Sequence, residues 1–367
     1  MRYGMAGSWL LVLPAVERLL LHVPERDFWL VDQQGEVNNG RPKEWTWGKV
    51  RWATKLAASS RGVGWNFGHR KVNDARSAMK AQKLDKKSFV LARIPRAILS
   101  YVVLDAVIHT ARSTAIPHSW SWEMDNLKQI VFVELLMGLS LLTTMTLQYE
   151  VAAMMAVGVA GGEPEDWPPL FGNIADCYMV GNVWGKYWHG YIRQVSPSTT
   201  QSIFHMILIS NVFKPALGIS RVIVKHLCIP PRSPHAYFIH LITAFSISGF
   251  FHFLGLSVIC EGYVDPMTLA LNMGLFFMIQ PFGTMIEYAV IQLCQGMRWS
   301  EHLITRTDSE RSVVDGVPKI LVRVLGYVWV FCWFIWTGWW FVEVYAAIGV
   351  LEWSMPFSLW TIGGKAG

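Results

Sequence analysis

The chain has 367 residues, of which 52% are hydrophobic and 16% are charged. In soluble domains about a quarter of the residues are charged. This composition therefore disfavours a water-soluble enzyme and predicts one polytopic membrane unit. The formal net charge is +6, and the five cysteines lack a Cys-x-x-Cys spacing, which disfavours a zinc or disulfide framework.

The first apolar stretch, Ser8 to Val23, is a poor signal peptide because Glu17 and Arg18 interrupt it and no small-residue cleavage site is clear. We therefore interpret it as an interfacial or re-entrant segment. Tryptophans then alternate with basic residues, a pattern typical of anchoring at a membrane surface. They are Trp45, Trp47 and Trp52, with Lys43, Lys49 and Arg51.

The segment from Arg61 to Arg96 is strongly basic, with ten Lys or Arg against only Asp74 and Asp85. Lys and Arg are in excess on the cytoplasmic side of membrane proteins, so we expect this segment in the cytosol. The chain divides accordingly. Residues 1–88 form an N-terminal interfacial segment and basic cytosolic region, and residues 89–367 form one membrane-bound helical domain.

Six apolar runs follow, and they predict an all-α fold: a polytopic transmembrane helical bundle with about six to eight membrane helices plus re-entrant or interfacial segments. Arg93 and Arg96 interrupt the first run, and Glu134 and Glu150 interrupt the second, so their ends are the least certain. The runs are Phe89 to Thr110, Ile130 to Ala160, Ile203 to Val224, Ala236 to Cys260, Met267 to Leu293 and Ile320 to Leu351.

The loop from Gly161 to Thr200 returns to the cytosol if each of the first two runs crosses the membrane once. It opens with a turn-rich stretch, Gly161-Gly-Glu-Pro-Glu-Asp-Trp-Pro-Pro169, which is incompatible with a helix. It then becomes aromatic and basic around Trp184-Gly-Lys-Tyr-Trp-His189.

The run from Ala236 to Cys260 contains no Asp, Glu, Lys or Arg but does contain His252. As a helix it is about 37 Å long, enough to span a bilayer with some tilt. An ionisable group inside a membrane is costly and is functional by default. Phe245, Ser248 and Gly249 share the helix face of His252, so small residues on that face leave room for a substrate.

Three sequence blocks follow one another along the chain. The first is Arg61-Gly-Val-Gly-Trp-Asn66. The second is Trp167-Pro-Pro-Leu-Phe-Gly172 with Trp184-Gly-Lys-Tyr-Trp-His-Gly-Tyr-Ile-Arg193, and the third is Phe245-Ser-Ile-Ser-Gly-Phe-Phe-His252. With them the chain resembles the wax-synthase-like acyltransferases of the membrane-bound O-acyltransferase superfamily, including fungal terpenoid O-acetyltransferases. The resemblance implies a multi-helix membrane fold, an acyl-CoA donor, an alcohol acceptor and a catalytic histidine at His252.

The chain departs from that family pattern in its second block. Lys186 and Tyr187 stand where the family carries Arg-Arg, and Gly190 replaces a common Gln. Lysine keeps a charge but lacks the planar two-point grip of arginine on phosphate. The start is also short for the family, so either a leading helix is absent or the sequence begins late.

The chemistry of acyl transfer fits these residues. An attacking hydroxyl must lose its proton to a base, and a neutral imidazole such as His252 suits cytosolic pH. His189 is a second catalytic candidate. On the donor side we expect aromatics to line the site and cations to meet CoA phosphates. These donor candidates are Trp184, Lys186, Trp188 and Arg193, and the acceptor pocket candidates are Phe245, Ser248, Gly249 and Asn66.

Structural roles compete with these assignments. His252 or His189 can simply bond a carbonyl or a neighbouring helix. The glycines around Arg61 are more often a packing turn than a binding loop, which weakens the case for Asn66.

The predicted function is transfer of acetyl from acetyl-CoA to a hydroxyl of a lipophilic terpenoid-type secondary metabolite, in the endoplasmic reticulum membrane. Large aromatics near His252, among them Phe250, Phe251 and Phe253, favour a short acyl chain. The alternatives are a long-chain wax-ester synthase, a polytopic transporter, and a membrane terpene cyclase using a carboxylate such as Glu134, Glu150 or Glu287. We predict membrane lipid contacts, no metal cofactor and no nucleic-acid partner, and the oligomeric state is open.

Overall fold

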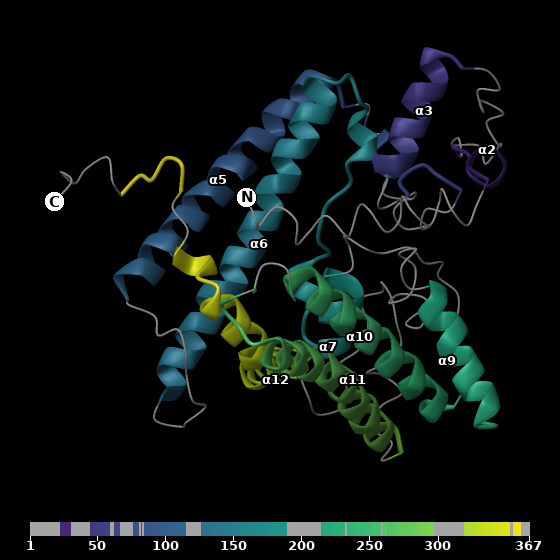
Figure 1. Cartoon of the computed structure of the whole chain (residues 1–367), viewed down its shortest axis with the longest axis vertical. Helices are drawn as coiled ribbons and strands as arrows, with labels where there is room; N and C mark the ends of the chain where they lie inside the picture. The colour runs from purple at the N-terminus through teal and green to yellow at the C-terminus, as the bar shows by residue number, and fades with distance from the viewer. Residues whose placement is uncertain are drawn as a thin grey trace.

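The computed structural model of the chain describes residues 23–30, 45–58, 62–66, 76–80, 82, 84–114, 126–188, 214–231, 233–257, 260, 262–296, 319–352 and 355–360. Helices make up most of these residues, and no strand occurs among them apart from an isolated antiparallel bridge that joins Leu30 to Trp65. The long helices form two groups (Figure 1), a hairpin of α5 and α6 and a group made of α9 to α12. The all-α prediction is confirmed.

The first group is a helical hairpin. Helix α5 (Lys86–Ser113) packs along α6 (Leu127–Gly158), as Figure 1 shows. Asp85 caps the start of α5 by accepting a hydrogen bond from the Ser88 backbone at 2.9 Å. At the same end of the hairpin, the Lys86 ammonium donates to the Gly161 carbonyl at 2.8 Å, just beyond the end of α6. The start of α5 and the end of α6 therefore lie side by side.

Two charges that interrupt the apolar runs of this hairpin neutralise each other. Arg93 on α5 and Glu150 on α6 form an ion pair at 2.7 Å, with both side chains only 7% exposed. The guanidinium also lies over the Phe89 ring, 4.3 Å from its centre. A buried charge is tolerated when it is paired, so both helices continue through these residues, at which the sequence left the helix ends uncertain.

The second group contains α9 (Lys214–His226), α10 (Pro234–Ser257), α11 (Pro266–Gly296) and α12 (Lys319–Ala347). Helix α10 packs between α9 and α11, and α11 packs on α12. Contacts of α12 with α6 join the two groups. Between the groups in sequence, the short α7 (Val180–Asn182) packs on α11 (Figure 1).

Four helices of the described residues are long and apolar enough to cross a membrane. Five of the six predicted runs coincide with long helices to within a few residues at each end. Helix α5, over the run from Phe89, is not among the four because charges dilute its apolar stretch. The run from Ile203 lies partly outside the described residues. The four helices are Leu127–Gly158, Pro234–Ser257, Pro266–Leu293 and Ile320–Ala347.

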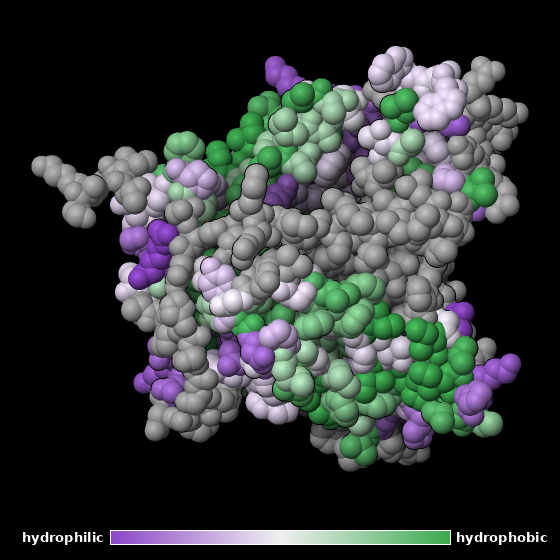
Figure 2. Space-filling view, in the orientation of Figure 1, coloured by the Kyte–Doolittle hydropathy of each residue, from purple (hydrophilic) through white to green (hydrophobic). Residues whose placement is uncertain are grey.

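The outer faces of these helices are apolar. In Figure 2 hydrophobic residues cover much of the visible surface over both helix groups. In water such a surface would be an aggregation hazard, whereas in a bilayer it is the expected lipid contact. The chain is therefore an integral membrane protein. Exposed side chains of α11 and α12 include Leu271, Leu275, Met278, Phe282, Leu325, Val328 and Phe331.

The N-terminal segments form a separate small core. Trp52 on α3 (Trp47–Ala58) packs with Trp65, Phe28 and Leu56. Trp52 is 7% exposed, so the expectation that it anchors the chain at a membrane surface is wrong for this residue. Trp45 and Trp47 are 87% and 86% exposed and keep that role as a prediction.

Candidate functional site

The site is built on a loop that α5 and α6 hold at one end of their hairpin. Arg93 uses its second nitrogen to donate to the Trp167 carbonyl at 2.7 Å. The Tyr149 hydroxyl on α6 donates to the Pro168 carbonyl. These bonds fix the Trp167-Pro-Pro stretch, which begins the second sequence block.

The two halves of that block lie against each other. The Gly172 backbone donates to the Tyr187 carbonyl at 3.1 Å, and the Phe171 and Tyr187 rings stack at 5.3 Å. A Cβ on Gly172 would lie 2.1 Å from the Lys186 carbonyl oxygen. Only glycine permits this approach, so the loop doubles back on itself here.

The loop becomes helical at Val180. Helix α7 continues into a π-helical turn, η5 (Val183–Tyr187), which carries Trp184 and Lys186. The sequence analysis treated this stretch as part of the loop from Gly161 to Thr200. Single π-turns are frequent at functional sites. We refer to Val180–Trp188 as the indole segment.

Two polar side chains of α11 hold the indole segment. Glu287 accepts hydrogen bonds from the Val180 and Gly181 backbones at 2.5 and 3.1 Å. Gln280 accepts one from the Trp184 indole at 3.1 Å. The first backbone N–H groups of a helix have no partner within it, and the Glu287 carboxylate supplies one.

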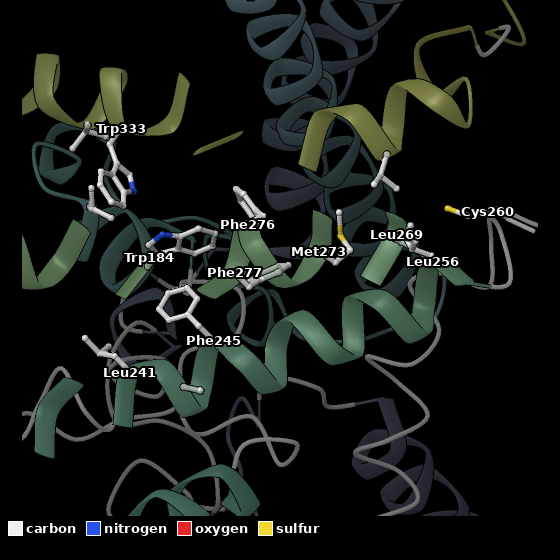
Figure 3. Packing of buried hydrophobic residues seen from close by; sticks show 14 of the residues in the cluster. Trp184, Leu241, Phe245, Leu256, Cys260, Leu269, Met273, Phe276, Phe277 and Trp333 are labelled. Carbon is white, nitrogen blue, oxygen red and sulfur yellow. The ribbon is translucent and has the colours of Figure 1, made fainter. Parts of the chain in front are cut away.

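Trp184 lies at the centre of an aromatic cluster from four elements (Figure 3). Its ring meets Phe245 of α10 edge-on at 5.4 Å, and lies 6.4 Å from Trp188. Phe277 of α11 and Phe334 of α12 complete the surroundings at 6.5 and 5.9 Å. The structure thus brings together residues of the second and third sequence blocks.

His252 joins this cluster through Phe277. The imidazole lies 4.4 Å from the Phe277 ring, between ring centres, and its Nδ1 lies 2.8 Å from the Ser248 carbonyl oxygen. A carbonyl only accepts hydrogen bonds, so Nδ1 carries the proton and the Nε2 atom of a neutral ring is the acceptor. In this tautomer Nε2 is the ring nitrogen that can accept a proton.

The small-residue face beside His252 is not open as the sequence suggested. A Cβ on Gly249 would lie 3.2 Å from the Phe277 Cβ and 3.4 Å from the Met273 carbonyl oxygen. The space that Gly249 leaves is therefore filled by α11. Ser248 contributes its carbonyl to the His252 ring. Its assignment to the acceptor pocket stays a prediction.

Charge near the indole segment comes from Lys186, which is exposed. Burial raises the pKa of the nearby Cys177 thiol to about 11, with the Asp176 charge adding to the effect. Burial also raises the pKa of Tyr187 above its ordinary value. Both groups are therefore neutral near pH 7, so neither competes with an anionic ligand for the Lys186 ammonium.

The side chain of Asn66, a candidate for the acceptor pocket, hydrogen-bonds within the N-terminal segments. Its side chain accepts from the Trp29 backbone at 3.1 Å and donates to the Asp27 carbonyl at 2.9 Å. Gly62 and Gly64 beside it have φ values of 63° and 76°, which glycine adopts readily. This geometry favours the packing-turn interpretation of the first block. His189 and Arg193 lie outside the described residues.

Comparisons with known proteins show what the stretch that carries this cluster is similar to. Residues 167–279 match the Membrane bound O-acyl transferase family, and this stretch contains both Trp184 and His252. An acetyltransferase of Arthrobotrys oligospora is 28% identical over 80% of this chain and 59% of its own length. Over residues 167–279 the chain is therefore similar to the Membrane bound O-acyl transferase family, and over most of its length it is similar to acetyltransferases.

Further relatives cover this chain unevenly. Acetyltransferase ple2 of Rhodocybe pseudopiperita is 26% identical over 91% of this chain and 76% of its own length. Acetyltransferase TRI7 of Fusarium sporotrichioides is 27% identical over 53% of this chain and 37% of its own length. The chain thus spans less than two thirds of several curated relatives. No solved structure matches the chain.

Sequence reasoning missed the contribution of α11 to the site. Phe277 and Gln280 were not singled out, and Glu287 was considered only as a proton donor for a cyclase. A signal was present: Gln280 and Glu287 are polar residues in an apolar run, seven residues apart and hence on one helix face.

Proposed function

We propose that this chain is an acyltransferase that moves an acetyl group from acetyl-CoA to a hydroxyl of a lipophilic, terpenoid-type secondary metabolite. The observation that carries the proposal is the aromatic cluster that joins Trp184 to His252 through Phe277. It connects a cationic segment suited to CoA with an imidazole suited to deprotonating an alcohol. The relatives in the comparisons are named acetyltransferases, which supports acetyl over a longer acyl chain.

In this mechanism His252 Nε2 takes the proton of the acceptor hydroxyl while the hydroxyl oxygen forms the new ester bond to the acetyl carbonyl carbon. The thioester carbon–sulfur bond breaks, CoA leaves as the thiol, and His252 returns the proton to the sulfur. The Ser248 carbonyl holds the ring in the tautomer that this step needs. The surrounding apolar side chains limit water, which would otherwise hydrolyse the thioester.

The donor is expected to bind at the indole segment. Lys186 offers a charge for the phosphates of CoA, and Arg193 is proposed to add a second. Trp184 and Trp188 present aromatic surface at 6.4 Å from each other, and His189 is proposed to line the same side. The lipophilic alcohol is proposed to enter from the bilayer, in the endoplasmic reticulum.

A terpene cyclase is less well supported by the carboxylates of the bundle. Glu150 is paired with Arg93, and Glu287 accepts from two backbone N–H groups and the Trp329 indole. Both therefore act as acceptors rather than proton donors. Glu134 is buried on α6 with one oxygen unpartnered among the described residues, so it is the carboxyl on which that alternative now depends.

The test is transfer of radiolabelled acetyl from acetyl-CoA to a panel of terpenoid alcohols by membranes containing the protein. Palmitoyl-CoA with a fatty alcohol is the parallel assay for a wax-ester synthase. We expect labelled acetyl ester in the first assay and none in the second. Ester formation only from palmitoyl-CoA would make the enzyme a wax-ester synthase, and no ester from any pair would refute acyl transfer.

A further inference from the structure

Helix α11 bridges the indole segment and α12 at two levels. At the first, Gln280 Oε1 accepts from the indoles of both Trp184 and Trp333, each at 3.1 Å. At the second, Glu287 binds the Val180 and Gly181 backbones together with the Trp329 indole at 2.9 Å. We call these two levels the Gln280 rung and the Glu287 rung.

The spacing of the rungs follows from helix geometry. Gln280 and Glu287 are seven residues apart on α11, and Trp333 and Trp329 are four apart on α12, so each pair lies on one helix face. The pairing runs in opposite directions along the two helices. It therefore requires α11 and α12 to pack antiparallel in one register, and a shift of one turn would break both rungs.

In the Gln280 rung every donor and acceptor of the Gln280 side-chain amide takes part in a hydrogen bond. Its side chain is 0% exposed, its oxygen has the two indole donors, and its nitrogen donates to the Phe276 carbonyl at 3.0 Å and the Thr337 hydroxyl at 3.3 Å. An amide has two donors and two acceptor lone pairs, so all four are used. Indole N–H groups only donate, which fixes the oxygen end of the amide toward Trp184.

The Glu287 rung likewise requires an acceptor-only group. Three N–H donors converge on its two oxygens. A glutamine there would place an NH2 group against at least one of these donors.

We propose that Gln280 and Glu287 are positioning residues that fix the indole segment relative to His252 and thereby set the affinity for the acyl-CoA donor. The inference rests on the proposed function, since it takes the indole segment as the donor side. The connection to His252 is short: Gln280 holds Trp184, Trp184 packs on Phe277, and Phe277 packs on the imidazole.

The test of the Gln280 rung compares Gln280→Met with Gln280→Glu in the full-length protein. Methionine fills a similar volume without an acceptor, whereas glutamate keeps oxygens for both indoles. We expect Gln280→Met to raise the KM for acetyl-CoA about tenfold, the effect of losing a buried hydrogen bond, with the KM for the alcohol unchanged and kcat within about twofold. Gln280→Glu keeps the acceptor for both indoles but loses the donor to the Phe276 carbonyl, so it should restore part of the donor affinity.

Thr337→Val is the matched control. It removes the hydroxyl that meets the Gln280 nitrogen but leaves both indole bonds to the oxygen. We expect its KM for acetyl-CoA to stay within about twofold of wild type. An equal rise in the control, or a rise in the KM for the alcohol in Gln280→Met, would overturn donor positioning and leave only a packing role.

The Glu287 rung is tested without activity, by hydrogen–deuterium exchange of the purified protein. Glu287→Gln should speed exchange of the Val180 and Gly181 amides about tenfold, since they lose a carboxylate acceptor, with little change along α5. Unchanged exchange at these amides would overturn the rung. Faster exchange with an unchanged KM for acetyl-CoA would overturn its role in donor binding.

Binding of radiolabelled CoA to the purified protein separates this inference from the proposed function. If the wild-type protein transfers no acyl group but binds CoA, and Gln280→Met weakens that binding, the positioning role stands and the proposed reaction fails. If the wild-type protein neither transfers acyl groups nor binds CoA, both fail. Transfer by the wild-type protein with unaltered CoA binding by Gln280→Met refutes the positioning role alone.

Discussion

The interiors of the two helix groups hold their polar residues in different ways. In the α5–α6 hairpin the buried contact is between full charges, Arg93 and Glu150, at 2.7 Å. In the α10–α12 group an amide and a carboxylate bind indole and backbone N–H groups. A buried ion pair adds little net stability because both charges lose their water, but breaking it is costly.

The two kinds of contact hold the second sequence block from two sides. The hairpin fixes the Trp167 end of the second block through the Arg93 guanidinium, and α11 fixes the Trp184 end through Gln280. The ionic contact determines where the loop starts, and the rungs orient the residues proposed to meet substrate. Substitutions in the hairpin should therefore act on stability, and those in the α10–α12 group on catalysis or donor affinity.

The largest effect is expected for His252→Ala, which removes the proposed base from the α10–α12 group. We expect activity to fall about 10²–10⁴-fold, the usual contribution of a positioned general base, in a protein that still inserts into membranes. His240→Gln is the matched control, because His240 is another histidine of α10 and bonds Ser220 at 2.5 Å. Acetyl transfer at the wild-type rate by inserted His252→Ala would remove the imidazole from the mechanism.

The next largest effect is expected on the stability of the α5–α6 hairpin. Arg93→Met leaves the Glu150 charge buried without its partner and should cost about 3–5 kcal/mol of unfolding free energy. The double variant Arg93→Met, Glu150→Leu removes both charges and should recover most of that loss. Thermal unfolding in detergent, followed by tryptophan fluorescence, measures both. Equal stability of the single and double variants would contradict the comparison between the two groups.

A smaller effect is expected for Lys186→Glu in the indole segment. Reversing this exposed charge should raise the KM for acyl-CoA about tenfold, because a charge-assisted bond to phosphate is lost, and leave the KM for the alcohol unchanged. Lys128→Glu makes the same charge change at the far end of α6 and serves as control. An effect of Lys186→Glu on the alcohol alone would argue against a donor role.

Much of the fold follows from the sequence because hydropathy reports helix length directly. The runs from Ile130, Ala236, Met267 and Ile320 match helices to within a few residues. What hydropathy does not report is pairing. Arg93 looked like an interruption because its partner, Glu150, lies 57 residues away in the sequence.

In the candidate site, too, the sequence predicts what lies on one helix face but not what packs against it. Spacing on one helix placed Phe245 and His252 on a common face, and the structure joins both to one aromatic cluster. The sequence does not indicate which helix fills that face, so the role of Phe277 was missed. Asn66 shows the opposite error: a polar residue in a recognisable block whose side chain serves the turn that contains it.

The smallest functional effect is expected from exposed cysteines that test on which side of the membrane the second block lies. Lys86 at the start of α5 bonds Gly161 beyond the end of α6, so the basic segment and the Trp167 loop share one side. The positive-inside rule predicts that this side is cytosolic. Helix α5 has 28 residues and is about 42 Å long, so we expect it to carry Ser113 to the other side although it is less apolar than the four candidate spans.

In a variant free of other cysteines, Ser77→Cys and Ile174→Cys should therefore react with an impermeant maleimide added to sealed microsomes. Ser113→Cys should react only after the vesicles are opened, because α5 separates it from Lys86. All three positions are exposed, so we expect activity within about twofold of the parent. If Ile174→Cys reacts only in opened vesicles, the Trp167 loop faces the lumen. Lys186, which the Gly172 contact holds against that loop, could then not meet cytosolic acyl-CoA.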